Sequence, residues 1–120
     1  MTRNILIVDD EEKIRGTFRR ILKKEGYQVR EAREGKEALH LIEEAIPDLV
    51  LLDLKMDGMD GVETLGEIRD GFPDLDVIVV TGFGNTRLME RALQYAPFTV
   101  INKPCSGEEL VRAIKPHLEE

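Results

Sequence analysis

Cysteine is almost absent from this chain, which has one cysteine, Cys105, among 120 residues. A single cysteine cannot form an internal disulfide, so a disulfide-stabilised scaffold is excluded and a reducing compartment is allowed. Long apolar runs are also missing, since none approaches the ~18–20 residues that a membrane-spanning helix requires. Residues 1–4 contain no apolar core of a signal peptide, so we expect a cytoplasmic protein.

Basic residues are scarce relative to acidic ones. The chain has 17 Lys and Arg against 24 Asp and Glu, which gives a net charge of −7. This balance argues against direct binding to nucleic acid or anionic lipid and permits a cation site. Apolar residues make up 42% of the chain, too many for a disordered protein. Since neither a repeat nor a linker interrupts the sequence, residues 1–120 are predicted to form one domain.

Five short apolar segments alternate with segments of helical period. Three of them are continuously apolar, as is typical of parallel strands covered on both faces: residues 5–8, 49–52 and 77–80. Residues 27–32 alternate between polar and apolar side chains, and residues 98–101 form a short run. We therefore predict edge strands at these two segments.

Helices are predicted after each strand, because apolar residues recur there at spacings of three and four. Their apolar stripes are Ile14, Phe18, Ile21 and Leu22; Ala38, Leu41, Ile42 and Ala45; Val62, Leu65 and Ile68; Leu88, Ala92 and Ala96; and Leu110, Ala113, Ile114 and Leu118. Gly26 is placed to end the first helix, and Ser106 with Glu109 forms a capping box. The pattern predicts an α/β fold, a (βα)5 doubly wound parallel sheet with the flavodoxin-like strand order 2-1-3-4-5.

Chemically active residues stand at the carboxyl ends of four predicted strands, which meet at one edge of such a sheet: Asp9, Asp10, Asp53, Thr81 and Lys103. Each alone is more often a cap, a turn former or a solvated charge, but together they indicate a site. Two carboxylates ~5 Å apart repel by about 3 kcal/mol at an effective dielectric near 20, so such a cluster favours a cation. An all-oxygen site suits Mg²⁺, and a carboxylate beside Mg²⁺, an ammonium and a hydroxyl is equipped to accept a phosphoryl group.

These residues resemble the motifs of chemotaxis-regulator-like receiver domains, the response-regulator domains of bacterial two-component signalling. The resemblance covers essentially the whole chain and is carried by Val8-Asp9-Asp10, Asp53-Leu54-Lys55-Met56, Gly61, Thr81-Gly82 and Lys103-Pro104. It implies a phosphoprotein that takes a phosphoryl group from a sensor histidine kinase onto Asp53. It also implies that Mg²⁺ or Mn²⁺ is bound by Asp10, Asp53 and the backbone carbonyl of Lys55, with Asp9 acting through water.

The resemblance assigns the other strand ends to the phosphorylated state. Lys103 would pair with the phosphoryl group, while the Thr81 hydroxyl and the Gly82 backbone would hydrogen-bond it. Lys103-Pro104 would be a cis peptide, since an X-Pro bond is where the cis form costs least. The output face would include Arg87, Glu90, Arg91, Tyr95 and Val100, and phosphorylation can drive receivers of this type to dimerise. No output domain is expected within residues 1–120.

Three departures from the family pattern bear on switching. Asp57 replaces a usual proline and is interpreted as a turn residue. Val100 replaces the aromatic residue that reports phosphorylation, and valine is stiff and too small for an aromatic pocket; Phe98, on the same face, is interpreted as core. Lys55 and Phe83 occupy the two positions that, in the family, govern the access of water to the phosphoryl group. Neither side chain is a good base for positioning that water, so slow self-dephosphorylation is predicted. The chain is then a signalling phosphoacceptor, not an enzyme.

Three other functions compete with that of a signalling phosphoacceptor. A haloacid-dehalogenase-like phosphatase needs a second Asp two residues after its nucleophile, where this chain has Lys55. A flavin or nucleotide module needs a phosphate-binding loop after the first strand, and the acidic residues 9–12 would repel it. A receiver-like interaction module that no longer switches stays open, favoured by Val100 and Asp57. His40 and His117 are interpreted as surface residues, and Cys105 as a packing residue.

Overall fold

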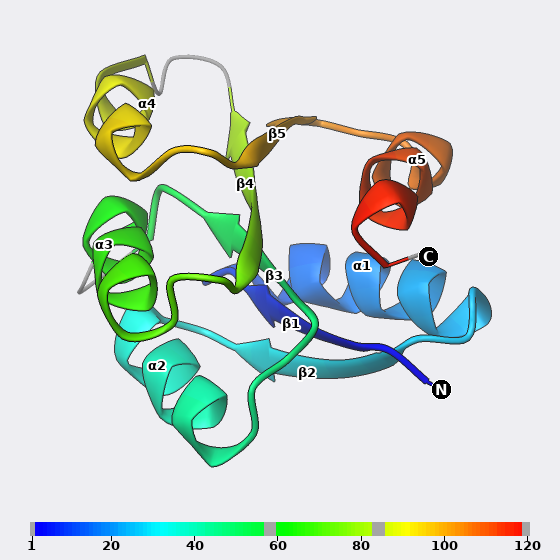
Figure 1. Cartoon of the computed structure of the whole chain (residues 1–120). Helices are drawn as coiled ribbons and strands as arrows, with labels where there is room; N and C mark the ends of the chain where they lie inside the picture. The colour runs from blue at the N-terminus through cyan, green and yellow to red at the C-terminus, as the bar shows by residue number, and fades with distance from the viewer. Residues whose placement is uncertain (1, 57–59, 83–85, 119–120) are drawn as a thin grey trace.

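The computed structural model describes residues 2–56, 60–82 and 86–118. Strands and helices alternate along the chain, as Figure 1 shows: β1 (Asn4–Val8), α1 (Glu12–Lys24), β2 (Gln28–Ala32), α2 (Gly35–Glu44), β3 (Leu49–Asp53), α3 (Gly61–Gly71), β4 (Asp76–Gly82), α4 (Thr86–Ala92), β5 (Thr99–Lys103) and α5 (Gly107–Leu118). A 3-10 turn, η1 (Leu93–Tyr95), follows α4. The predicted (βα)5 arrangement is confirmed.

The strands form one parallel sheet in the order β2-β1-β3-β4-β5. This is the predicted order, and β2 and β5 are its edges as expected. The continuously apolar strands lie in the middle because a central strand of a parallel sheet is covered on both faces. All five residues of β3 are buried, whereas both edge strands are partly exposed.

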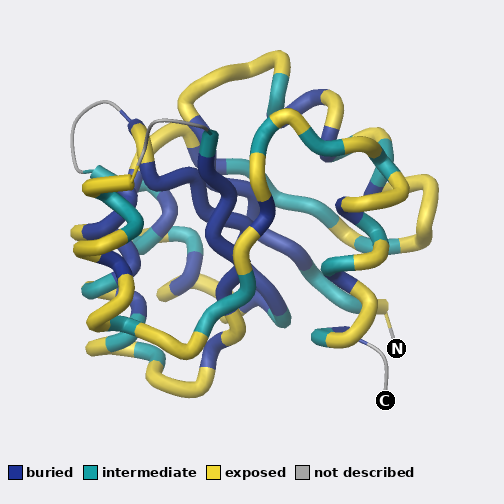
Figure 2. Tube along the Cα trace, turned by 90° about the horizontal axis from the view of Figure 1, so that it is seen from above, coloured by how far each residue is buried: buried dark blue, intermediate teal, exposed yellow. Residues whose placement is uncertain are grey.

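Helices cover both faces of the sheet (Figure 1). Helices α1 and α5 lie on one face, and α2, α3 and α4 lie on the other. Each face has its own apolar cluster, because successive side chains of a strand point in opposite directions. In Figure 2 the buried residues follow the central strands and the exposed ones follow the outer turns of the helices. Among the described residues, no helix is both long enough and apolar enough to cross a bilayer.

Two local signals read from the sequence act as predicted. Gly26 follows the C-cap residue of α1 and has φ 93°, a left-handed conformation that favours glycine and commonly ends a helix. At the start of α5, the Ser106 Oγ accepts a hydrogen bond from the Glu109 N–H at 3.1 Å. The Glu109 carboxylate accepts one in return from the Ser106 N–H, also at 3.1 Å. This reciprocal pair is the expected capping box.

Two positions assigned to apolar helix stripes are not in helices. Ala45 is the extended residue after α2 and is exposed, and Ala96 is an exposed, extended residue after η1. Pro97 directly follows Ala96, and the residue before a proline is disfavoured in helical conformation. Pro47 stands two residues after Ala45, where a proline that cannot continue the helix is common. The spacing pattern therefore ran past the helix ends in both cases.

Candidate functional site

The carboxyl ends of the strands bring the predicted site residues to one edge of the sheet. Asp9 directly follows β1, Asp53 ends β3, and Lys103 ends β5. Asp9 is 2% exposed and Asp53 5% exposed, whereas Asp10 is exposed to solvent. Carboxylate oxygens of Asp9, Asp10 and Asp53 lie within 4.8 Å of one another. Three acids from two strand ends thus form one compact cluster.

Lys103 closes the cluster from β5. Its Nζ donates to Asp9 Oδ2 at 2.7 Å and lies 3.4 Å from Asp53 Oδ2, so the ammonium is held more closely by Asp9. Burial by itself lowers the pKa of Lys103, but the hydrogen bond to Asp9 and the charge of Asp53 together outweigh it and raise the pKa above its ordinary value. The lysine is therefore a fixed positive charge in the site.

The ionised form of Asp53 is disfavoured in this structure. The pKa of Asp53 is raised from 3.8 to about 6; burial is the largest cause, and the nearby charge of Asp9 acts in the same direction. The Lys103 charge and a 3.2 Å hydrogen bond from the Lys55 N–H lower it in part. One ammonium does not compensate the acidic cluster, which is the condition that favours a bound cation.

The residues present fit a hard divalent cation. Asp9, Asp10 and Asp53 all offer carboxylate oxygens, the ligands that Mg²⁺ prefers, and the exposed Asp10 leaves one side open to water. A cation there would also offset the repulsion that raises the pKa of Asp53. The donor set therefore suits Mg²⁺ through Asp10 and Asp53, with Asp9 nearby.

Thr81 and Gly82 end β4 beside the acids. Thr81 is 5% exposed, and among the described residues its hydroxyl makes one long hydrogen bond, 3.4 Å, to the Gly82 carbonyl. Such a bond is easily exchanged for a better acceptor. The Lys103–Pro104 peptide bond is cis in the structure. Of the other positions singled out above, Asp57 and Phe83 lie outside the described residues.

The start of α3 lies tightly against the end of β3. The Gly61 N–H donates to the Leu54 carbonyl at 3.0 Å. A Cβ at Gly61 would lie 2.3 Å from the Asp53 carbonyl oxygen and 2.3 Å from Leu54 Cα, which leaves no room for a side chain. Gly61 is therefore required for α3 to begin directly beside Asp53.

Arg15 is absent from the set of site residues that the strand ends predict. It lies on α1 but is only 7% exposed, and its guanidinium donates to the Asp9 carbonyl at 2.7 Å. A signal exists in the sequence, because Arg15 is three residues before Phe18 and seven before Leu22, on the apolar face of its helix. A charged residue at such a position needs a buried partner.

The predicted output face is mostly exposed. Val100 is 41% exposed, while Phe98 packs against the core cluster on the α2–α3–α4 side, as expected. Arg87 and Glu90 are exposed on α4. Two further members of the predicted face contact α3: Arg91 pairs with Asp60 at 3.2 Å, and Tyr95 lies against Gly66.

His117 is not the surface residue that the sequence suggested. Its Nε2 lies 2.9 Å from Thr99 Oγ1 and its Nδ1 lies 3.2 Å from Asp76 Oδ2. The reason is tertiary, since the last turn of α5 lies across the first residues of β4 and β5. His40 is exposed as expected and pairs with its helix neighbour Glu44. Cys105 packs against the α1–α5 cluster, and burial raises the pKa of its thiol, with a smaller contribution from the charge of Glu109.

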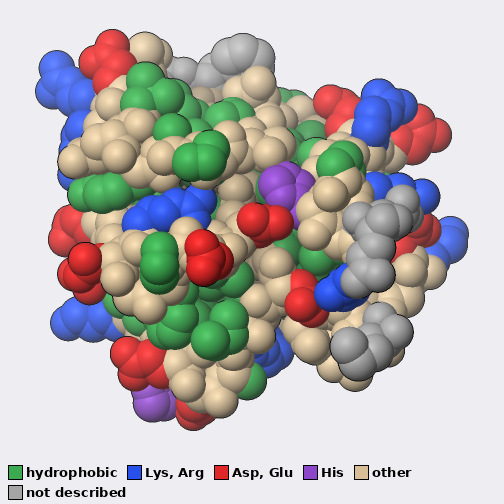
Figure 3. Space-filling view, viewed as in Figure 1, with side chains coloured by type: hydrophobic (Ala, Val, Ile, Leu, Met, Phe, Trp, Pro, Cys, Tyr) green, Lys and Arg blue, Asp and Glu red, His purple; other side chains and the backbone are tan. Residues whose placement is uncertain are grey.

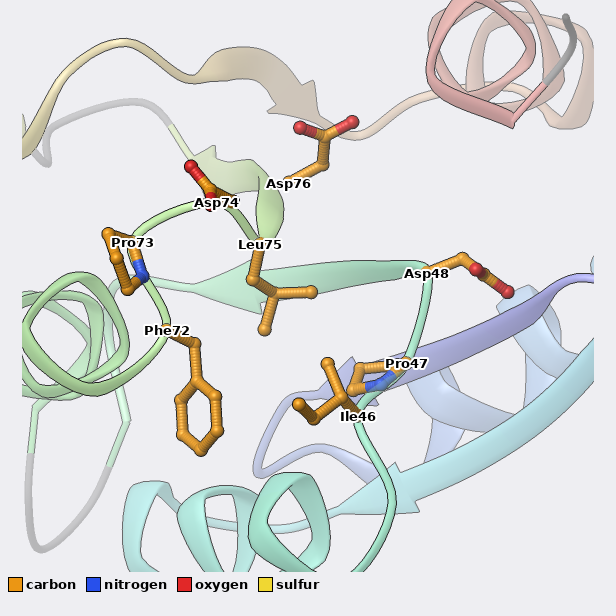
Figure 4. A pocket seen from close by; sticks show the side chains of 8 residues that line it. All are labelled: Ile46, Pro47, Asp48, Phe72, Pro73, Asp74, Leu75 and Asp76. Carbon is orange, nitrogen blue, oxygen red and sulfur yellow. The ribbon is translucent and has the colours of Figure 1, made fainter.

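The pocket drawn in Figure 4 is separate from the acidic site. Its volume is about 410 Å³, and it lies among Asp48, which precedes β3, Phe72, which follows α3, and Asp76, which begins β4. It is therefore at the opposite edge of the sheet from the Asp53 carboxylate. On the face that Figure 3 shows, the described Lys and Arg side chains are interspersed with Asp and Glu, so this face carries no continuous basic patch.

Fold and site together define a doubly wound α/β domain with an acidic cluster and a lysine at the carboxyl edge of its sheet. Residues 5–115 match the family model described as response regulator receiver domain. The chain belongs to this family, and it is a receiver domain of two-component signal transduction.

Individual relatives agree with this assignment. The chain is 36% identical over 118 residues to sporulation initiation phosphotransferase F of Bacillus subtilis, covering 98% of this chain and 95% of the relative. It is 36% identical to the nitrogen assimilation regulatory protein NtrX of Azorhizobium caulinodans, covering 99% of this chain but 27% of that protein. Among solved structures, a CheY-like receiver domain protein of Methanospirillum hungatei superposes with a TM-score of 0.93 at 33% identity, covering 99% and 95% of the two chains.

Proposed function

We propose that this receiver domain accepts a phosphoryl group from the phosphohistidine of a sensor histidine kinase onto Asp53, in a reaction that requires Mg²⁺. The proposal rests mainly on the position of the Asp53 carboxylate. It is 5% exposed, it lies 3.4 Å from the Lys103 ammonium, and it shares a cluster with Asp9 and Asp10. We further propose that residues 1–120 act as one receiver domain in the cytoplasm.

Each residue of the cluster has a separate task in this transfer. Mg²⁺, or Mn²⁺, held by Asp10, Asp53 and the Lys55 carbonyl, with Asp9 acting through water, would neutralise charge on the phosphoryl oxygens. An Asp53 oxygen attacks phosphorus, the phosphorus–nitrogen bond breaks, and the donor imidazole leaves with a proton from solvent. Lys103 stabilises the negative charge of the transferred group.

Thr81 and Gly82 act after the transfer. The Thr81 hydroxyl exchanges its long bond to the Gly82 carbonyl for a stronger, charge-assisted bond to a phosphoryl oxygen. The Gly82 backbone N–H serves as a second donor. This exchange draws the end of β4 toward Asp53 and so connects phosphorylation to the neighbouring α4 and β5.

The lifetime of the phosphorylated state should be long. The Lys55 side chain ends in an ammonium, which cannot accept a proton from water. Phe83, which lies outside the described residues, has no basic group at all. We expect phosphorylated protein to persist for much longer than seconds with Mg²⁺ alone. A half-life of seconds, measured by intact mass after removal of the donor, would contradict this proposal.

The output face proposed for this chain comprises α4, η1 and β5, with Arg87, Glu90, Arg91, Tyr95 and Val100 as contact residues. Its partner is either an output protein or a second phosphorylated copy. Val100 is 41% exposed and stands where the family usually has an aromatic residue. Its exposure favours a readout in which Val100 contacts the partner directly, instead of one in which an aromatic side chain turns inward and is buried. The membership in the receiver family and the intact cluster favour a switching domain over a module that no longer switches.

Intact-mass spectrometry after incubation with acetyl phosphate tests the acceptor and the metal together. We expect a gain of one phosphoryl group in wild type with Mg²⁺, and none in EDTA or in Asp53→Asn. Asp74→Asn is the matched control, because Asp74 is an exposed carboxylate away from the cluster, and it should be phosphorylated like wild type. Phosphorylation of Asp53→Asn, or no phosphorylation of wild type, would refute the proposal.

A second measurement separates the switching domain from the non-switching module. Amide NMR spectra of wild type before and after phosphorylation should show shifts at Arg91, Tyr95 and Val100. The same shifts should be lost in Thr81→Ala although this variant still gains the phosphoryl group. Phosphorylation that leaves these amides unchanged in wild type would instead support the module that no longer switches.

A further inference from the structure

We infer that Arg15 is a positioning residue for the cation site: its buried guanidinium fixes the peptide that joins Asp9 to Asp10, and so sets the geometry of both carboxylates. The inference rests on the proposed function, since it concerns the affinity of the site for Mg²⁺. It assigns a task to a buried charge that the transfer of the phosphoryl group does not itself use.

The contact joins α1 directly to the backbone of the site. Arg15 Nη1 donates to the Asp9 carbonyl at 2.7 Å, and both groups are buried. That carbonyl belongs to the same rigid peptide plane as the N–H of Asp10. Rotation of this plane would turn the two carboxylates relative to each other. A hydrogen bond to its oxygen therefore restrains Asp9 and Asp10 at once.

The other contacts of Asp9 act on the preceding peptide and on its side chain. The Asp9 N–H donates to the Ala32 carbonyl at 3.1 Å, which fixes the preceding peptide on β2. The Asp9 side chain accepts from the Glu11 N–H at 2.9 Å and from Lys103 at 2.7 Å. These bonds locate the start of the turn and one carboxylate, whereas the Arg15 bond acts on the peptide between the two acids.

The guanidinium is itself held in place by Glu31 on β2. Arg15 Nε donates to Glu31 Oε1 at 3.2 Å, and Arg19, one turn later on α1, donates to the other oxygen of the same carboxylate. Arg15 is thus anchored at its Nε and aims Nη1 at the Asp9 carbonyl. The fork geometry of a guanidinium allows both bonds, and a lysine ammonium does not reproduce it.

Geometry and electrostatics predict opposite effects of removing Arg15. A positive charge close to the site repels a divalent cation, so removing the charge alone would tighten Mg²⁺ binding. Loss of the hydrogen bond that restrains the Asp9–Asp10 peptide would instead let the two carboxylates move and would weaken Mg²⁺ binding. Partners one shell beyond the ligands typically change metal affinity by about 10–100-fold. The sign of the change therefore decides between the two effects.

Isothermal titration calorimetry of Mg²⁺ into Arg15→Met tests the inference, with the chain otherwise intact. We expect binding at least about tenfold weaker than in wild type. Arg15→Lys, which keeps the charge and loses the fork, should also weaken binding. Arg19→Met is the matched control: it removes an equal charge from the same Glu31 carboxylate without touching the Asp9 carbonyl, and its affinity should stay near that of wild type.

A second control addresses general loss of stability. Arg30 also donates to the backbone, to the carbonyls of Leu41 and Ala45 at the end of α2, away from the acidic cluster. Arg30→Met should lower the melting temperature without changing the Mg²⁺ affinity. In metal-free Arg15→Met, the amide NMR signals of Asp10 and Glu11 should move, which a role confined to stability would not require.

Three results would overturn the inference while wild type still binds Mg²⁺ and is phosphorylated: unchanged or tighter binding in Arg15→Met, an equal loss of affinity in Arg30→Met, or unmoved Asp10 and Glu11 amides. Failure of wild type itself to bind Mg²⁺ would refute the proposed function and this inference with it. Because wild type is measured first, the two failures are distinguished.

Discussion

Replacing Asp53 by asparagine should stabilise the metal-free protein at neutral pH, although it removes the proposed phosphoacceptor. Burial, with the charge of Asp9, raises the pKa of Asp53 from 3.8 to about 6. A rise of roughly two pKa units means that ionised Asp53 disfavours the folded state by about 3 kcal/mol relative to the unfolded chain. Asparagine carries no charge to desolvate, and its side-chain oxygen can still accept the hydrogen bond from the Lys55 N–H.

The sign of the pH dependence follows from proton binding. Between pH 3.8 and about 6 the folded state holds a proton on Asp53 that the unfolded chain releases, so this group lowers stability as the pH rises through that range. Above the pKa of Asp53 in the folded state, about 6, Asp53 is ionised in both states and the loss of stability is complete. The stabilising effect of Asp53→Asn should therefore be about 1–3 kcal/mol near pH 7.5 and close to absent near pH 4.

Urea unfolding followed by far-UV circular dichroism in EDTA, at both pH values, measures this difference. Asp74→Asn is the control, since it removes one exposed carboxylate and should change stability by less than about 0.5 kcal/mol. Adding Mg²⁺ should close the gap, because a cation that binds the folded wild type stabilises it. The reasoning fails if Asp53→Asn is no more stable than wild type near pH 7.5, or if its advantage is equally large near pH 4.

Three further predictions concern packing and capping, each measured by urea unfolding. Gly61→Ala should destabilise the fold by about 2–3 kcal/mol, because its Cβ would meet backbone atoms at 2.3 Å. Its control is Gly71→Ala, whose Cβ would meet open space at the end of α3 and which should stabilise the fold by about 0.5 kcal/mol. His117→Ala should cost about 1–2 kcal/mol through the loss of two hydrogen bonds, against less than about 0.5 kcal/mol for the exposed His40→Ala. Ser106→Ala should cost about 1 kcal/mol by removing the N-terminal cap of α5.

Each of these has an outcome that would contradict it. A tolerated alanine at Gly61 would mean that the start of α3 does not approach Asp53 as closely as described. Equal effects of His117→Ala and His40→Ala would show that the link from α5 to β4 and β5 adds nothing. An unchanged stability of Ser106→Ala would remove the capping box from the account of how α5 begins.

Much of the fold was readable from the sequence because it depends on local pattern. The apolar runs within β1, β3 and β4 have the length and composition of buried parallel strands, and helical spacing separates them. The right-handed connection rule then leaves few topologies. The errors fell where a proline outweighed spacing, at Ala45 and Ala96, since spacing says nothing about where a helix ends.

The sequence was enough to predict which residues come together in the candidate site. Asp9, Asp53 and Lys103 follow strands of one parallel sheet, so the topology alone brings them to the same edge. Their distances were not predictable, because the 2.7 Å and 3.4 Å separations of Lys103 from the two acids depend on how β5 pairs with β4. The preference of Lys103 for Asp9 is therefore a property of the folded chain.

By itself, the sequence determined the element order, the strand order and the set of chemical groups at the carboxyl edge, because these depend on side-chain type and spacing. Tertiary structure decided how those groups behave. Burial raises the pKa of Asp53, the packing of α1 on β2 brings Arg15 to the Asp9 carbonyl, and the end of α5 places His117 against Thr99. Each depends on contacts between elements far apart in the chain, and both desolvation and hydrogen bonding are set by such contacts.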